Sequence, residues 1–217
     1  MVTVEQLSLA IRKSYEWHSG VVYGGGMVMT DQLNGTASAI DKHYKGKDKT
    51  EVLVTALLSK AWEEKRHNEK TKSNPKAGNS YEDLLKNFGL TVADNIRAMS
   101  SEPDLKDWHA MADWAKKQNP QVQVVLLAEK LQNFIVSRDK PNPNKEPAWH
   151  INYYNTRMIM VEALREACPA LYVQCVKVAE QGIAAQQRKL AEMEQVVQPT
   201  PVVKASETHT PERSNGR

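Results

Sequence analysis

The sequence predicts an all-α domain over residues 1–196, followed by a disordered tail at residues 197–217. Apolar residues recur at intervals of three and four in several stretches, as they do in helices that bury one face. Helix-start signals precede several of these stretches. The chain has 217 residues, 41% of them hydrophobic, which is enough for a sizeable core and excludes the fibrous and wholly disordered classes.

The N-terminal third contains two predicted helices and one irregular segment. Four apolar residues predict the buried face of the first helix: Val4, Leu7, Ile11 and Tyr15. The Gly-rich stretch from Gly20 to Thr30 is predicted to be a loop or a short extended piece. Thr50, before Glu51, is a helix-start signal, and the following helix has a face that includes Leu57, Ala61 and Glu64.

Four helices are predicted in the rest of the domain. Ser80 and Asp83 form a capping box that marks the start of the first of them. The apolar run Val122 to Leu127 is assigned to a buried central helix, because its pattern continues through Leu131, Phe134 and Ile135. Pro147 is a first-turn proline. It precedes a helix with the face Ile151, Tyr154, Met158, Val161 and Leu164, and the last helix covers about residues 170–196.

Polar and proline-rich segments predict the connections. His67 to Asn79 is expected to form a mobile basic loop, and Lys140 to Pro147, with three prolines, a connection. From Gln198 onward the composition is typical of a disordered tail. Ala184 to Val196 is expected to be an exposed amphipathic helix that either packs on the domain or binds a partner.

Composition also limits function. The 29 Lys and Arg residues nearly balance the 26 Asp and Glu residues, so a nucleic-acid partner is not expected. No apolar run of about 20 residues and no signal peptide is found, which predicts a cytoplasmic protein that does not engage a membrane. Cys168 and Cys175 are expected to be small buried residues, because their spacing along one helix, about 10 Å, is too long for a disulfide.

Five segments between Ile11 and Leu164 resemble, in order, the HD-domain hydrolases of the RelA/SpoT type, including the small stand-alone alarmone hydrolases. The second reads A-L-L-S-K-A-W-E-E where the family has A-L-L-H-D-x-x-E-D, and the fourth reads L-A-E-K-L-Q-N where the family has L-A-D-K-L-x-N. The resemblance implies an HD-type helical bundle. The segments are His18 to Ala37, Ala56 to Glu64, Tyr81 to Ala93, Leu127 to Asn133, and Trp149 to Met158.

The resemblance implies a metal site that this chain has lost. In the family a divalent metal, usually manganese, activates water to remove pyrophosphate from the ribose 3′ position. The four ligand positions here read Gln32, Ser59, Lys60 and Glu129. Neutral hydroxyl and amide groups are weak ligands for such a metal, and a lysine puts positive charge where a dication would bind. We therefore expect no metal cofactor and no family catalysis.

Other positions are carried over from the family in the same way. The acidic pair associated with activating the attacking water is Glu63 and Glu64, which would be vestigial catalytic residues. Lys130 and Asn133 stand at positions that approach the nucleotide in the family. The family's opening arginine falls on Tyr23, so one basic contact attributed to nucleotide recognition is missing.

These substitutions suggest the hypothesis that the Lys60 ammonium stands in for the metal by pairing with Glu129, and also with Glu63. The sequence then favours an inactive binding or regulatory module for a guanine or other phosphorylated nucleotide. One alternative is a divergent phosphohydrolase acting on (p)ppGpp or another nucleotide, with Mn²⁺ as cofactor and altered ligands. Another is a helical scaffold that binds a protein partner through its C-terminal helix.

The active alternative would need a rearranged metal site. His67 or His109 could contribute to it together with Glu63, Glu64 and Asp113, because distance along the chain does not fix distance in space. The rearranged site is the less favoured explanation, because ordinary surface histidines account for all six His residues of the chain.

Overall fold

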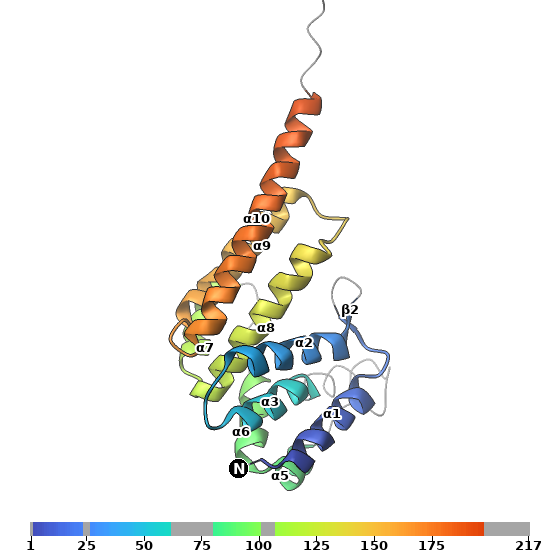
Figure 1. Ribbon diagram of the computed structural model, residues 1–217, viewed down its shortest axis with the longest axis vertical. Coiled ribbons are helices and arrows are strands. Elements are labelled where there is room, and N and C mark those ends of the chain that lie inside the picture. The colour runs from blue at the N-terminus through green and yellow to red at the C-terminus, as the bar shows by residue number, and fades with distance from the viewer. Residues whose placement is uncertain (1, 24–26, 62–79, 101–106, 198–217) are drawn as a thin grey trace, which may run out of the picture.

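A computed structural model of the chain is a bundle of helices (Figure 1) and describes residues 2–23, 27–61, 80–100 and 107–197. The predicted all-α class is confirmed. The helices are α1 (Val4–His18), α2 (Met29–His43), α3 (Lys49–Leu58), α5 (Tyr81–Phe88), α6 (Leu90–Met99), α7 (Trp108–Lys116), α8 (Pro120–Asp139), α9 (Pro147–Ala163) and α10 (Pro169–Val197).

The predicted irregular segment after α1 contains a small antiparallel hairpin. Strand β1 (Val22–Tyr23) pairs with strand β2 (Met27–Val28), and Val22 lies opposite Val28. Helix α2 begins directly after β2, so the extended piece ends slightly earlier than the sequence predicts.

The buried face of α1 differs from the prediction. Val4, Ile11 and Tyr15 are exposed, with 74%, 42% and 51% of their surface accessible. The helix instead buries the stripe Ala10, Ser14, Trp17 and His18. Because Trp17 is the largest apolar side chain on the helix, its burial fixes the face and places a serine and a histidine in the interior. The hydrophobic pattern could not indicate a stripe that is half polar.

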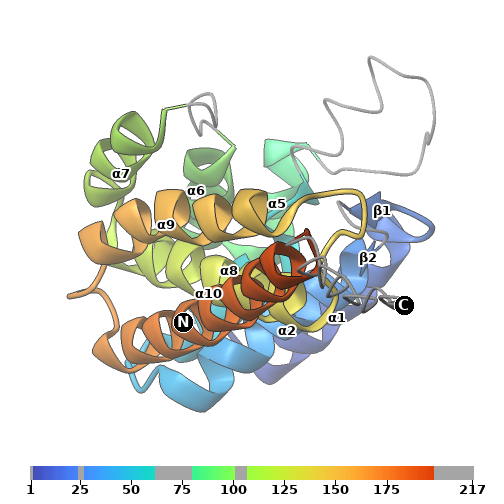
Figure 2. The same cartoon turned by 90° about the horizontal axis from the view of Figure 1, so that it is seen from above.

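Two apolar clusters form the core. The larger is built mainly by α2, α8, α9 and α10, and the smaller by α1, α3, α5 and α6. Helix α8 is the buried central helix predicted from Val122 to Leu127, and it packs against both α2 and α10. Figure 2 shows α9 and α10 running side by side above α8. The exposed end of α10 extends well beyond the rest of the bundle (Figure 1).

Most predicted start signals are present. Ser80 and Asp83 form a capping box, and Pro147 lies in the first turn of α9. The start at Thr50 was wrong, because α3 begins at Lys49 with Asp48 as its N-cap residue. The Asp48 carboxylate accepts hydrogen bonds from the side chains of Tyr44 and Gln121 and makes no capping bond.

The two cysteines and one of the predicted connections lie where the sequence predicts them. Cys168 and Cys175 are free and buried, as expected, and Lys140 to Glu146 forms the connection before α9. The expected basic loop, His67 to Asn79, and the tail from Gln198 onward lie outside the described residues. None of the described helices combines the length and the apolar character that crossing a membrane requires.

Candidate functional site

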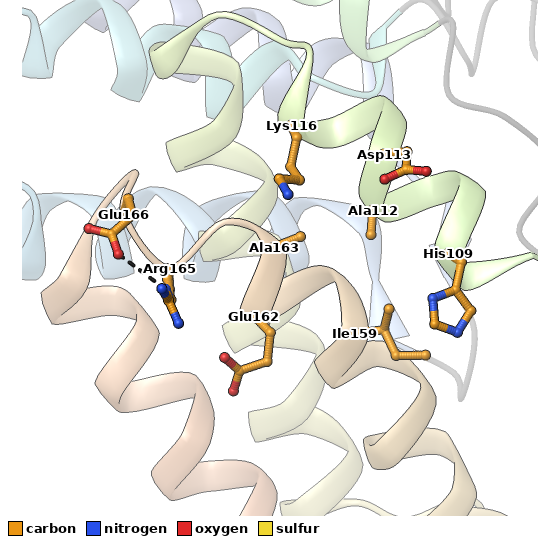
Figure 3. A pocket seen from close by; sticks show the side chains of 9 residues that line it. All are labelled: His109, Ala112, Asp113, Lys116, Ile159, Glu162, Ala163, Arg165 and Glu166. Carbon is orange, nitrogen blue, oxygen red and sulfur yellow. Dashed lines mark hydrogen bonds and ion pairs between the residues drawn. The ribbon is translucent and has the colours of Figure 1, made fainter.

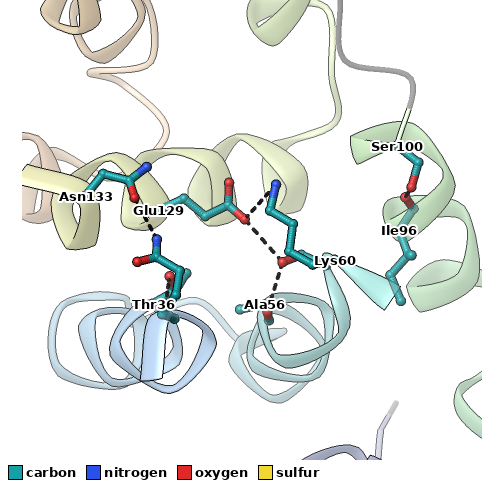
Figure 4. Close-up of polar contacts among 9 residues, drawn as sticks. Thr36, Ala56, Lys60, Ile96, Ser100, Glu129 and Asn133 are labelled. Carbon is teal, nitrogen blue, oxygen red and sulfur yellow. Dashed lines mark hydrogen bonds and ion pairs between the residues drawn. The ribbon is translucent and has the colours of Figure 1, made fainter. Parts of the chain in front are cut away.

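The four positions assigned to the lost metal site come together where three helices meet. Gln32 lies on α2, Ser59 and Lys60 form the turn after α3, and Glu129 lies in the middle of α8. All four are buried or nearly so. Figure 4 shows two groups of polar contacts, one that joins Glu129 to Lys60 and Ser59 and one that joins Gln32 to Asn133.

Lys60 and Glu129 form the predicted ion pair. Lys60 Nζ lies 3.7 Å from Glu129 Oε1, and the two side chains are 12% and 6% exposed. A pair this well shielded from water interacts more strongly than an exposed pair, but each charge would be costly to leave alone in the interior. The ammonium and the carboxylate therefore depend on each other.

Ser59 contacts this pair, and Gln32 contacts Asn133, which lies on the same helix as Glu129. Ser59 Oγ is 3.2 Å from Glu129 Oε1 and 3.1 Å from the Ala56 carbonyl oxygen, so its single proton can be donated to either. Gln32 Nε2 donates to Asn133 Oδ1 at 2.9 Å. Gln32 Oε1 is buried and has no hydrogen-bond partner. The polar groups thus mostly satisfy one another within the protein.

His18, at the end of α1, is a further member of the site that the assignments above left out. It is fully buried, and neither ring nitrogen has a hydrogen-bond partner. Burial and, as a smaller effect, the positive charge of Lys60 together lower the pKa of His18 from 6.5 to about 4. The imidazole is therefore neutral at pH 7 and does not repel the Lys60 ammonium.

Lys130 and Asn133, the two candidate nucleotide contacts on α8, are engaged inside the protein. Asn133 accepts the hydrogen bond from Gln32. Lys130 is buried, and its Nζ lies 5.7 Å from the centre of the Trp108 ring on α7. The Arg157 guanidinium lies 4.6 Å from the same ring.

These contacts belong to a row of cations and aromatic rings along α9. Arg157 stacks on Tyr153 at 3.5 Å, the Tyr153 and Trp149 rings are 5.5 Å apart, and Lys145 lies 5.5 Å from Trp149. The row joins α9 to α7 and ends at Lys130. The sequence contains a signal for it, because Trp149, Tyr153 and Arg157 are spaced four apart within α9 and so share one helix face.

The remaining candidate residues fall outside what the structure describes. Glu63 and Glu64 lie in the segment 62–79, which is outside the described residues, and so does the predicted contact between Lys60 and Glu63. The backbone of Tyr23 pairs with Met27 in the hairpin, and its side chain is likewise outside the described set.

The described residues do not fit a divalent cation. Of the four positions, only Glu129 offers a carboxylate, while Lys60 places an ammonium beside it and Ser59 can donate a proton to it. Among these four positions Gln32 Oε1 is the one buried acceptor without a hydrogen-bond partner, and a single amide oxygen is a weak ligand. Within the described ranges, no group of three or more His, Cys, Asp and Glu residues could hold a metal ion.

A separate cavity of about 510 Å³ lies between α7 and the end of α9 (Figure 3). It is lined by His109 and Asp113, two residues considered for a rearranged metal site, and by Lys116 and Glu162 among others. Figure 3 shows the His109 and Asp113 side chains on the same helix. This cavity shares no residue with the site around Glu129, and its apolar lining residues are Ala112, Ile159 and Ala163.

Comparison with known proteins supports the fold. No family model matches the chain, and no curated protein matches it in sequence. A solved structure described as a metazoan orthologue of SpoT that hydrolyses ppGpp, with a role in starvation responses, superposes with a TM-score of 0.67. The two share 16% sequence identity over 83% of this chain and 97% of that one. The chain therefore has the fold of a ppGpp hydrolase, as the resemblance in sequence implied.

Proposed function

We propose that the chain is a non-catalytic protein on a ppGpp-hydrolase fold and acts as a binding or regulatory module for a phosphorylated nucleotide. The observation that carries this proposal is the Lys60–Glu129 pair, with 3.7 Å between Nζ and Oε1 in a nearly dry site. The ammonium occupies the position that the resemblance gives to a metal ligand. Without a metal to polarise it, a water molecule in this site has no route to a hydroxide at neutral pH.

The charge of the site supports an anionic ligand rather than a metal cation. Among the described residues, Lys60 and Lys130 supply two positive charges and Glu129 one negative charge, and His18 is neutral because of its lowered pKa. A net charge of one positive unit in a shielded site attracts phosphate and repels a dication. Trp108, whose ring centre lies 5.7 Å from Lys130 Nζ, adds aromatic surface of the kind on which a base can stack.

A thermal-shift series with ppGpp, GDP, GTP and ATP tests nucleotide binding. A ligand at about 100 times its dissociation constant adds about 2.7 kcal/mol to the free energy of unfolding. We expect at least one of these nucleotides to raise the melting temperature. The variant Lys130→Met should weaken that shift, while Lys86→Met on the distant helix α5 should leave it unchanged. A series in which no nucleotide shifts the melting temperature contradicts the binding role.

A parallel assay tests the absence of catalysis. The protein is incubated with ppGpp and Mn²⁺, and released pyrophosphate is measured against a buffer control. We expect no release above the control. Turnover that rises with Mn²⁺ would instead support the alternative of a divergent phosphohydrolase with altered ligands, whatever the outcome of the binding experiment.

A further inference from the structure

Arg157 on α9 covers aromatic surface on two different helices. Its guanidinium carbon lies 3.5 Å from the centre of the Tyr153 ring on α9 and 4.6 Å from the centre of the Trp108 ring on α7. Its Nη1 donates a hydrogen bond to the Tyr153 carbonyl oxygen at 3.4 Å. The guanidinium therefore lies on ring surface that a stacking ligand would need.

Trp108 is the ring of this group that lies near a second cation. Lys130 Nζ is 5.7 Å from its centre, and the Trp108 side chain is partly exposed. Tyr153 is less accessible to a ligand, because Trp149 comes one turn before it and Arg157 one turn after it on the same helix face. A nucleotide that meets Lys130 and stacks on Trp108 thus enters the space that Arg157 occupies.

We propose that Arg157 selects phosphorylated nucleotides against unphosphorylated nucleosides, an inference that rests on the proposed nucleotide-binding function. A base that stacks on Trp108 has to displace the guanidinium from the ring. The displaced guanidinium can then form charge-assisted, bidentate hydrogen bonds with a phosphate group of the same ligand. A nucleoside has no phosphate, so the guanidinium would lose its ring contacts and gain only water in exchange.

The two cations differ in their freedom to move. Lys130 is buried, with 6% of its surface exposed, so its ammonium is held in place by the surrounding helices. Arg157 is partly exposed and has a long side chain, so its guanidinium can turn from the rings toward solvent. Since both cations lie near one ring, the phosphates of a ligand stacked there can meet both. Lys130 would then hold the anion, and Arg157 would exchange ring contacts for phosphate contacts.

Calorimetric titration of the full chain with two matched ligand pairs tests this selection. The pairs are GDP with guanosine and ATP with adenosine, and within each pair only the phosphates differ. In wild type we expect at least one nucleotide to bind more tightly than its nucleoside. In Arg157→Ala the nucleoside of that pair should bind at least about tenfold more tightly than it binds wild type, because no guanidinium has to be displaced. The ratio of the two affinities should therefore fall.

Two further variants control for indirect effects. Lys145→Ala removes a cation 5.5 Å from the Trp149 ring, and it should leave the wild-type ratio of affinities unchanged. Arg157→Lys keeps a cation that can pair with phosphate but cannot stack flat on a ring, so its ratio should lie between those of wild type and Arg157→Ala. Circular dichroism of each variant checks that the fold is intact.

The possible failures are distinguishable. An unchanged ratio of affinities in Arg157→Ala would show that Arg157 does not select the ligand, although nucleotide binding itself stands. A ratio that falls only because the nucleotide binds more weakly would make Arg157 a phosphate contact and contradict its displacement from the ring. Wild-type protein that binds none of the four ligands would overturn the proposed nucleotide-binding function and this inference together.

Discussion

Lys60 Nζ lies 3.7 Å from Glu129 Oε1, at a place where three helices close over both groups. Each of these charges would be unstable there without the other. The pair thus explains how the fold can retain an interior polar site in the absence of the metal that the resemblance implies. It also predicts how the protein responds when either charge is removed.

Breaking the pair should destabilise the protein more than removing both charges. We expect Glu129→Leu or Lys60→Met to lower the free energy of unfolding by about 3 kcal/mol, because each removes one half of a shielded ion pair and leaves the other charge in place. The double variant Lys60→Met with Glu129→Leu should recover much of that loss. Urea denaturation of all four proteins gives the coupling energy.

The exposed pair Lys13–Glu16, with 2.9 Å between Nζ and Oε2, provides the matched control. Breaking it should cost less than about 1 kcal/mol. A coupling energy for Lys60 and Glu129 no larger than that of the control pair would contradict the buried interaction.

His18 should make the protein sensitive to acid. Its pKa is 6.5 in the unfolded chain and about 4 in the folded one, so the unfolded state binds the proton first as pH falls. The stability linked to His18 is fully present above pH 6.5 and is lost as pH falls toward 4. The loss is about 3 kcal/mol. Urea denaturation across this range measures it.

The variant His18→Phe should flatten this pH dependence, because the buried group no longer titrates. His43→Gln is the control, since His43 is only partly buried and its pKa is lowered mainly by partial burial. Equal slopes for wild type and His18→Phe would show that His18 is not the group responsible.

Arg157 should hold α9 to α7. Its guanidinium contacts both Tyr153 and Trp108, so Arg157→Ala removes two cation–π contacts and should cost about 1 to 2 kcal/mol. Arg157→Lys keeps the charge but loses the planar stacking and should recover only part of this. Lys145→Ala, at the exposed end of the row, should cost less. Denaturant titration followed by tryptophan fluorescence compares the three variants.

Gly182 should be required where α10 crosses α9. A Cβ at this position would lie 2.3 Å from the ring of Tyr154, which is fully buried and cannot move aside easily. Gly182→Ala should therefore destabilise the protein by about 1 to 3 kcal/mol. In an exposed helix the same change stabilises by about 1 kcal/mol. Thermal unfolding beside the exposed control Gln181→Ala shows the sign, and a stabilised variant would contradict this packing.

The sequence predicted the helices better than their faces. Long periodic segments such as the one around Leu127 were assigned correctly, because a fully buried helix leaves an unambiguous apolar pattern. On α1 two stripes competed, and the one that carries Trp17 is buried although it includes Ser14 and His18. A pattern based on hydrophobicity cannot predict that a polar residue lies inside.

The sequence predicted the site best at the position where this chain carries a charge opposite to that of the family it resembles. Lys60 in place of an aspartate identified the ion pair with Glu129, which the structure contains. The role of His18 was not predictable, since its burial depends on how α1 packs against α3 and its lowered pKa depends on that burial. The contact between Lys130 and Trp108 also depends on helices that are distant in the sequence.

Calorimetric titration of Mn²⁺ into the full chain tests the central claim most directly. The account predicts no saturable heat for the wild-type protein, because the Lys60 ammonium is already paired with the one described carboxylate at the four ligand positions. The variant Ser59→His with Lys60→Asp removes the positive charge, adds two strong ligands and should gain saturable binding. Binding of one Mn²⁺ per chain by the wild-type protein would contradict the account.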